Sequence, residues 1–277
     1  MKKICAMTMA RNDIFFLEKW ISYYGAELGK ENLFIYLDGK DQQIPTNAEG
    51  TNIELHDHVE EEMTVGDRTR IAFLNSEAAR HLMNYELVIG LDVDEFLVVD
   101  PRCNESLKSY LSHARCTPSI SGLGVDVGQK TGMEGKIDVR KPFLSQRSFA
   151  LIDSQYTKPV VISKPVRWGA GFHRVKNHNY RIDKNLYIFH FGSFDLDILQ
   201  QKISDKFKIQ SGWSKHLEQR KRTINLVVRK KPLDGNVFLP VARLLQTIIR
   251  HPFAWLRPYM YFWKLVIQIP ERFRDSV

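Results

Sequence analysis

The first ninety residues of the chain alternate short apolar runs with segments that have the period of a helix. Apolar runs of this length are typical of buried strands, and the periodic segments predict helices that cover them. A strand–helix alternation favours a parallel sheet, so this part is predicted to be α/β and Rossmann-like, with a mostly parallel sheet. The predicted strands are 4–9, 33–37, 52–55 and 87–91, and the predicted helices are 13–29 and 67–81.

The segment 13–29 has the end signals of a helix as well as its period. Asp13 has the short polar side chain that favours an N-cap, and Gly29 is typical of the residue that follows a helix. Apolar side chains recur between them at helical spacing and predict one buried face, formed by Phe16, Leu17, Trp20, Ile21, Tyr24 and Leu28.

The pattern changes after residue 101. Short strand-like pieces, such as 159–162 and 186–189, alternate with glycine-containing loops, which favours an α+β second half packed on the first. Residues 197–231 are predicted to be helical and basic. Residues 236–270 are predicted to contain a helix followed by an aromatic stretch, and one apolar face of that helix is formed by Val241, Leu244, Leu245, Ile248 and Ile249.

The composition is that of an ordinary folded protein. Of 277 residues, 43% are hydrophobic and 26% are charged, which excludes a disordered or fibrous chain. The longest stretch without an acidic or basic residue, 116–125, is about half of a membrane span, so no transmembrane helix is expected. The three cysteines lack CxxC spacing, and the apolar run 4–10 is too short for a signal peptide. We therefore expect a cytoplasmic protein with neither disulfides nor a zinc site.

The net charge of +8 is concentrated near the C-terminal end. Residues 1–201 carry 24 basic and 27 acidic side chains, whereas 202–231 carry ten basic and two acidic ones. Aromatic and basic residues are interleaved in 253–264, as in segments that lie in a membrane interface. We therefore expect 202–277 to associate peripherally with an anionic membrane. A cover for the core or a dimer contact is the alternative for the aromatic stretch.

Three carboxylates, Asp92, Asp94 and Glu95, interrupt the apolar run 87–99. An ionised carboxylate that is buried without a partner is very costly, so a cationic group is expected beside them. Asp92 and Asp94 are two residues apart at a strand end, which predicts that they point the same way and address one metal ion or its ligand. Hard oxygen ligands favour Mg²⁺ or Mn²⁺. A turn with solvated acids is the alternative.

Four motifs, in this order, resemble those of GT-A glycosyltransferases, in particular glycosyltransferase family 2-like proteins and the related family 92. The first is the segment 9–20, which reads MARNDIFFLEKW, and the second is the strand-like segment 32–38. The third is the acidic sequence DVDEF at 92–96. The last is a series of three short sequences, Lys164-Pro165-Val166, Gly171-Phe172-His173 and Phe189-His190-Phe191.

This resemblance implies a GT-A fold in 1–200, with a nucleotide-sugar half (1–100) and an acceptor half (101–200), followed by a tail at 201–277. It implies a metal-dependent glycosyltransferase that moves a sugar, with inversion, from a nucleotide-sugar donor to a glycan or lipid-linked acceptor. A UDP-sugar is the expected donor. The expected setting is the synthesis of a cell-surface polysaccharide or glycolipid at the inner face of the membrane.

The resemblance also implies roles for residues at the matching positions. Asp94 and His190 would bind Mn²⁺ or Mg²⁺, with Asp92 reaching the metal through water or the donor through its ribose. His173 would approach the acceptor or a phosphate. A core histidine and a loop histidine are the alternatives for His190 and His173. The implied donor-binding residues are Ala10, Arg11, Asn12, Asp38 and Asp92.

The catalytic base is left open by the motifs. Inversion needs a carboxylate within hydrogen-bond reach of the acceptor hydroxyl. Asp126, Glu134 and Asp153 are the candidates in the second half, and Asp126 is preferred because it interrupts the apolar run 123–127.

Two other classes of protein fit part of the sequence. A nucleotidyltransferase would also use a carboxylate cluster and a nucleotide, but the turn at 9–13 lacks a glycine-rich phosphate loop. The basic pI suggests a nucleic-acid-binding protein. However, no helix-turn-helix, zinc-finger or RNP-like motif is present, so no nucleic-acid partner is expected.

Overall fold

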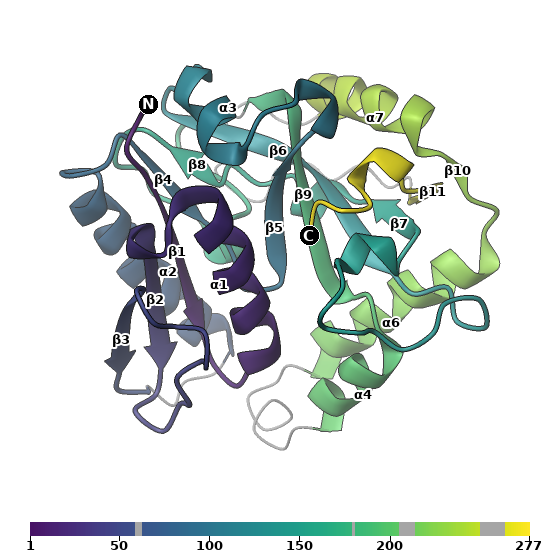
Figure 1. The fold of residues 1–277 in the computed structure, drawn as a ribbon, viewed down its shortest axis with the longest axis horizontal. Helices are drawn as coiled ribbons and strands as arrows, with labels where there is room; N and C mark the ends of the chain where they lie inside the picture. The colour runs from purple at the N-terminus through teal and green to yellow at the C-terminus, as the bar shows by residue number, and fades with distance from the viewer. Residues whose placement is uncertain (59–62, 179–180, 205–213, 250–263) are drawn as a thin grey trace.

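The computed structural model describes residues 1–58, 63–178, 181–204, 214–249 and 264–277 (Figure 1). Within these ranges the strands join into one mixed sheet with helices on both faces. The strands are β1 (Ile4–Ala10), β2 (Leu33–Asp38), β3 (Asn52–His56), β4 (Leu87–Gly90), β5 (Glu95–Val99), β6 (Ser119–Gly128), β7 (Phe149–Ile152), β8 (Val161–Ile162), β9 (Ile182–Ser193), β10 (Leu233–Asp234) and β11 (Leu265–Gln268). The α-helices are α1 (Ile14–Leu28), α2 (Met63–His81), α3 (Leu107–His113), α4 (Leu196–Ser204), α6 (Ser214–Arg229) and α7 (Gly235–Ile249).

The N-terminal half contributes four parallel strands to the sheet, in the order β3-β2-β1-β4. Successive side chains of a strand point to opposite faces, and this alternation divides the core here. Ala6 packs in the cluster that contains α1, whereas Met7 packs in the cluster that contains α2. The predicted Rossmann-like α/β arrangement of the first half is therefore confirmed.

Helix α1 follows its sequence signals closely. All six residues of the predicted apolar face are buried. The helix ends at Gly29, whose φ of +91° is a conformation that glycine adopts without strain. The Asp13 side chain accepts no capping hydrogen bond, and its backbone carbonyl accepts the first helical bond from Leu17 N at 3.0 Å.

The second half is α+β, as predicted, and it continues the same sheet. Strand β8 joins the halves because it pairs antiparallel with both β4 and β6. Strand β9 lies between β5, to which it is antiparallel, and β6, to which it is parallel. This pairing sets Glu95 and Asp126 on either side of His190, one on each neighbouring strand.

The described part of 201–277 belongs to the packed body and is not an appended helical tail. Helix α6 contacts β6, β7 and β9, and β11 pairs antiparallel with β7. Phe273 is fully buried, with its ring centroid 5.0 Å from that of Tyr187 and 5.2 Å from that of Phe189. The helix predicted within 236–270 ends at Ile249, and 265–268 is a strand because its apolar side chains complete the sheet edge next to β7.

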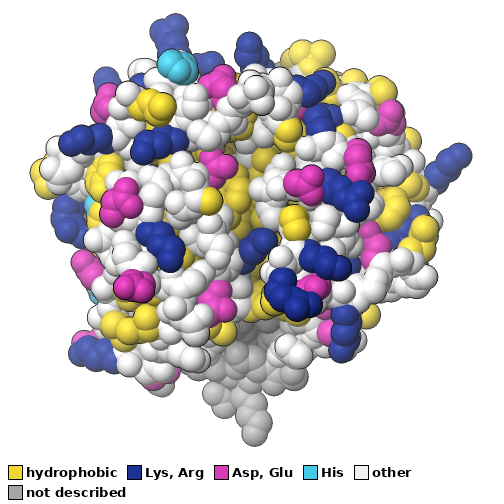
Figure 2. All heavy atoms as spheres, in the orientation of Figure 1, with side chains coloured by type: hydrophobic (Ala, Val, Ile, Leu, Met, Phe, Trp, Pro, Cys, Tyr) yellow, Lys and Arg dark blue, Asp and Glu magenta, His cyan; other side chains and the backbone are white. Residues whose placement is uncertain are grey.

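Helix α7 presents its predicted apolar stripe to solvent. Of the predicted residues, Val241, Leu244, Ile248 and Ile249 have exposed fractions of 42%, 62%, 70% and 39%, and Leu245 is half-buried; Val237, which was not predicted, is 55% exposed. Figure 2 shows hydrophobic side chains at the upper edge of the molecule, where α7 runs. The helix packs on the body through its other side, which buries Gly235, Leu239, Ala242 and Gln246. The predicted aromatic stretch falls mainly in 250–263, outside the described residues.

Candidate functional site

The acidic cluster lies in the turn between β4 and β5, at the carboxyl edge of the parallel strands. Leu91 N still donates to Met7 O on β1, but Glu95 N donates to Asp92 O, so the chain turns between Asp92 and Glu95 and does not extend β4. The period-two expectation for Asp92 and Asp94 therefore does not apply. Their side chains have different partners, and only Asp92, with 26% of its side chain exposed, remains open to solvent.

Two protein cations hold Asp92. Arg70 on α2 donates to Asp92 Oδ1 at 2.6 Å, and the Lys158 ammonium donates to Asp92 Oδ2 at 3.1 Å. Burial alone would raise the pKa of Asp92, but the Lys158 and Arg70 charges outweigh burial and lower it well below its usual range. Asp92 is thus an ionised carboxylate at physiological pH. The predicted need for a cation beside the cluster is met by residues of the chain itself.

Lys158 also neutralises the deepest carboxylate of the cluster. Its Nζ lies 2.5 Å from Glu95 Oε1, and both side chains are almost fully buried. Glu95 Oε2 is buried and accepts no hydrogen bond within the described structure. Burial raises the pKa of Glu95 to about 7 even though Lys158 opposes the shift. Lys158 reaches this position because Val160 O accepts a hydrogen bond from Gly90 N at 2.9 Å, which anchors its segment beside the end of β4.

His190 lies between two carboxylates on neighbouring elements. Its Nε2 is 3.5 Å from Asp94 Oδ2, and its Nδ1 donates to Asp126 Oδ1 at 2.6 Å. Burial would lower the pKa of His190, but the charges of Asp94 and Asp126 outweigh burial and raise it to about 9. The ring of Tyr156 stacks on the imidazole at a centroid distance of 3.8 Å. His190 is therefore fixed in orientation, with Nε2 directed toward Asp94.

Asp126 in turn is held from the C-terminal part of the chain. Thr223 on α6 donates its hydroxyl to Asp126 Oδ2 at 2.7 Å. Both carboxylate oxygens of Asp126 are thus engaged, one by His190 and one by Thr223. A carboxylate that is fully buried in this way is placed to orient His190, and not to take a proton from an acceptor hydroxyl.

The carboxylates of the other two candidate bases, Glu134 and Asp153, are also engaged by hydrogen bonds or an ion pair. Glu134 accepts hydrogen bonds from the backbone N–H groups of Lys130 and Ser148, at 2.7 Å each. Asp153 accepts from Gln155 N at 3.0 Å and pairs with Lys264. The contacts of these two carboxylates are structural.

The predicted donor-binding residues lie at the ends of β1 and β2, the strands that flank this edge. The Arg11 guanidinium, placed directly after Ala10, donates to the backbone carbonyl of Asp38 and pairs with Asp41 at 3.0 Å. Asn12 has a positive φ of 51°, and its N–H donates to Gln42 Oε1 at 2.7 Å. The Asp38 carboxylate is 2.9 Å from His58 Nδ1. The ends of the two strands are thus cross-linked into one rim.

His173 lies on a third segment near this rim. It follows a short 3₁₀ turn, and its Nδ1 is 2.8 Å from Gln155 O. The neighbouring Phe172 packs under the guanidinium of Arg70, which is 5.9 Å from the ring centroid. Because Arg70 holds Asp92, the segment that carries His173 packs against one of the partners of the acidic cluster.

Arg70, Lys158 and Thr223 are the contributors that the sequence analysis missed. The apolar surroundings of Asp92 and Glu95 required a counter-charge, but nothing local distinguished the correct two cations among 40 lysines and arginines. Thr223 follows a run of exposed-looking basic residues. Thr223 lies on the same side of the helix as Ile224 and Val227, and these two apolar residues could have indicated that this side is buried.

The described residues contain no group of three or more His, Cys, Asp or Glu side chains placed to hold a metal ion. Of the predicted ligands, Asp94 and His190 face each other, whereas Asp92 is turned toward two cations. The structure thus brings together one carboxylate oxygen and one imidazole nitrogen. No helix in the described ranges is long and apolar enough to cross a membrane.

Comparisons with known proteins find the sequence to be distant from them. No family model matches, and no curated protein matches. Among solved structures, mannose-1-phosphate geranyltransferase from Thermus thermophilus is 9% identical and has a TM-score of 0.31, over 96% of this chain and 74% of that one. A glycosyltransferase involved in the glycosylation of the major capsid of PBCV-1 is 14% identical, with a TM-score of 0.24 over 48% and 54%.

A third solved structure, CMP:2-keto-3-deoxy-manno-octonic acid synthetase complexed with CTP, is 11% identical. Its TM-score is 0.28, over 80% of this chain and 87% of that one. Similarities at this level do not identify a function.

Removing the buried ammonium is expected to destabilise the protein strongly. Lys158→Met leaves Asp92 and the buried Glu95 with one cation between them, so the free energy of unfolding should fall by about 3–5 kcal/mol. Adding Glu95→Gln should restore part of this loss, since a neutral amide needs no counter-charge. Chemical denaturation at pH 7 measures all three proteins. A loss below about 1 kcal/mol for Lys158→Met would show that the cluster does not depend on this lysine.

Proposed function

We propose that the protein is a metal-dependent glycosyltransferase that uses a nucleotide-sugar donor. The observation that carries the proposal is the place of His190 between Asp94 and Asp126, at the edge of a parallel sheet where open α/β proteins bind ligands. The order of motifs that resembles GT-A glycosyltransferases supports the same activity. The proposed acceptor is a glycan or a lipid-linked sugar.

The donor atoms of Asp94 and His190 fit a divalent cation, and on binding it His190 would lose the Nε2 proton that it otherwise carries next to Asp94. A carboxylate oxygen and an imidazole nitrogen suit Mn²⁺, and Mg²⁺ is commonly held by one or two protein groups together with substrate phosphates. Metal-bound histidines usually donate their second N–H to a carboxylate, as His190 donates to Asp126. When bound, the ion would act as a Lewis acid toward the departing diphosphate.

The remaining residues of the site then act as supports. Arg70 and Lys158 keep Asp92 ionised and fixed, so we assign Asp92 to a hydroxyl of the donor and not to the metal. Asp126 is assigned as a positioning residue that sets the tautomer of His190, because a carboxylate can only accept the Nδ1 proton. The rim formed by Arg11, Asn12 and Asp38 is the proposed border of the nucleotide pocket.

A nucleotidyltransferase is the second candidate, because the same pair of ligands would also serve a nucleoside triphosphate. The two activities differ in their products. A nucleotidyltransferase joins a nucleoside triphosphate to a sugar phosphate and releases pyrophosphate, whereas a glycosyltransferase transfers the sugar of a UDP- or GDP-sugar to the acceptor and releases the nucleoside diphosphate. Product analysis with both substrate pairs separates the candidates.

Nucleotide binding is expected to require the metal. UDP should stabilise the protein by about 2.7 kcal/mol at a hundredfold excess over Kd when Mn²⁺ is present, and not in EDTA. Asp94→Asn should abolish this difference, whereas Asp197→Asn, an exposed carboxylate of the same type, should keep it. Thermal unfolding with UDP, GDP and CMP measures the effect. Equal stabilisation in EDTA would contradict the assigned metal.

The hydroxyl of Thr223 is expected to tune the metal site from a distance. Thr223→Val should weaken Mn²⁺ binding about tenfold, since loss of such an outer hydrogen bond typically costs 10–100-fold. Thr223→Ser keeps the hydroxyl and should bind Mn²⁺ like the unmodified protein. Titration with Mn²⁺ in the presence of UDP, followed by electron paramagnetic resonance, gives the affinities. Equal affinity of the valine and serine variants would remove Thr223 from the site.

We also propose that the protein associates peripherally with an anionic membrane through α7. The exposed apolar stripe of α7 supplies side chains that can enter a membrane interface, and the preceding residues Arg229, Lys230 and Lys231 are exposed cations. Each basic side chain near an anionic surface contributes about 1 kcal/mol. Charge and apolar area together form the pair of signals that stable peripheral binding needs.

Two acidic substitutions on the stripe are expected to release the protein from membranes. Leu244→Asp with Ile248→Asp should abolish flotation with phosphatidylserine vesicles. Met133→Asp with Val139→Asp, at similarly exposed apolar positions elsewhere, should leave flotation unchanged. Flotation that survives the α7 substitutions would exclude the stripe, and a change from dimer to monomer in the same variant would assign it to a second copy of the chain.

A further inference from the structure

We propose that a pocket at the amino ends of β1 and β2 is a second binding site, which takes a small phosphate-bearing compound that also carries a ring. The pocket has a volume of about 640 Å³, within the range of ligand sites. It lies at the opposite end of these strands from the acidic cluster. Strand β1 has seven residues, so the two sites are about 20 Å apart along it.

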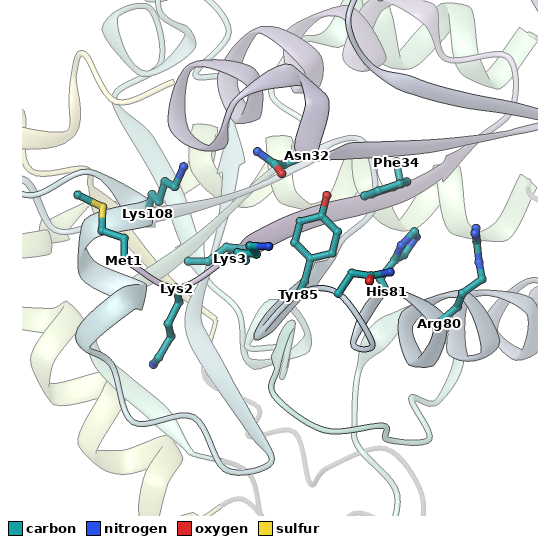
Figure 3. A pocket seen from close by; sticks show the side chains of 11 residues that line it. Met1, Lys2, Lys3, Asn32, Phe34, Arg80, His81, Tyr85 and Lys108 are labelled. Atoms are coloured by element: carbon teal, nitrogen blue, oxygen red, sulfur yellow. The ribbon is translucent and has the colours of Figure 1, made fainter.

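The lining of the pocket carries positive charge without any carboxylate. Four basic residues contribute to it, Lys2, Lys3, Arg80 and Lys108, and the other lining residues are neutral or aromatic. Because a carboxylate-free wall with several cations selects for anions, the expected ligand carries negative charge. Figure 3 shows these side chains around the cavity.

Two of the four cations are already used in the fold. The Lys2 ammonium donates to the carbonyl oxygens of Leu111 and Ala114, at 3.3 and 2.9 Å, and so closes the end of α3. Arg80 pairs with Glu77 on its own helix. The contacts of these two side chains explain their presence without any ligand.

The ammonium groups of Lys3 and Lys108 have no such role. Within the described ranges, neither Nζ forms an ion pair or a hydrogen bond. The Glu86 carboxylate accepts the backbone N–H of Lys3 at 3.0 Å and does not line the cavity. Two unpaired ammonium groups, one from the residue before β1 and one from α3, are therefore available to bind a phosphate, which accepts charge-assisted hydrogen bonds well.

An aromatic wall completes the pocket. The rings of Phe34 and His81 are 3.8 Å apart, and Tyr85 meets both edge to face, at 5.9 and 6.4 Å. His81 adds no charge, because burial and the nearby Arg80 lower its pKa to about 4. Figure 3 shows the ring of Tyr85 between Lys3 and His81. This wall offers an apolar face to a sugar or base ring.

The test measures binding in EDTA, which silences the proposed metal-dependent site. UMP, glucose 1-phosphate and inorganic phosphate are titrated into the full-length protein by calorimetry. Both ring-bearing phosphates are expected to bind more tightly than inorganic phosphate, and their ranking distinguishes a nucleotide from a sugar phosphate. Asp94→Asn should bind them like the unmodified protein, so failure of the proposed activity would not affect this result.

Variants then locate the site. Lys3→Gln with Lys108→Gln should weaken all three probes at least about tenfold, the size expected for loss of hydrogen bonds to a charged group. Lys136→Gln, whose side chain is 85% exposed elsewhere, should change nothing. Tyr85→Leu should weaken the ring-bearing probes and not inorganic phosphate. Retained affinity in the double variant, or no preference for a ring, would overturn the proposal.

Discussion

The cost of burying carboxylates is the constraint on which the rest of the structure depends. Asp94 and Glu95 lie inside the protein, and an unpaired charge there would cost several kcal/mol. The chain meets this cost with cations from three separate elements, namely α2, the segment before β8, and β9. Because Lys158 and His190 come from the second half, the cluster adds buried ionic contacts between the two halves to the pairing through β8.

One path of hydrogen bonds extends this joint to the C-terminal quarter. Thr223, Asp126, His190 and Asp94 lie in a row, so that α6, β6, β9 and the acidic turn are connected through buried polar contacts. Each member of such a row needs all its partners, since a buried polar group left unpaired is costly. Thr223 and helix α6 are therefore part of the support of His190, although the basic composition of this segment suggests a detached tail.

The periodicity of the sequence predicted helices and strands far better than it predicted which side chains contact one another. In α1 the spacing of the apolar residues from Phe16 to Leu28 identified the buried face correctly. In an α/β unit a helix with a broad apolar stripe packs that stripe on the sheet. The same reasoning identified a stripe on α7, but there the packed side is formed by Gly235, Leu239, Ala242 and Gln246. Only one of these four, Leu239, is a large apolar residue, so the packed side has a weak hydrophobic signature.

In the acidic motif, too, the sequence predicted the local requirement but not the distant residues that meet it. Its apolar flanks correctly predicted that a counter-charge is needed. They could not identify Lys158, which lies more than sixty residues away in the sequence. They could not identify Arg70 either, because the apolar residues of its helix do not form a clear stripe. The expectation that Asp92 and Asp94 share one ligand rested on strand geometry, and a turn begins after Gly90.

The separation of Asp92 from Asp94 bears on how one short motif can serve two purposes. The Lys158 ammonium is the counter-charge of both Asp92 and Glu95. If this cation were instead placed between Asp92 and Asp94, Glu95 would lack a counter-charge. In the turn, Asp92 and Glu95 face Lys158, whereas Asp94 faces His190, so every carboxylate has a cationic partner. The first pair secures the fold at the edge of the sheet. Asp94 faces an imidazole whose other nitrogen is already fixed by Asp126, and it is therefore the member of the motif that we propose for the metal.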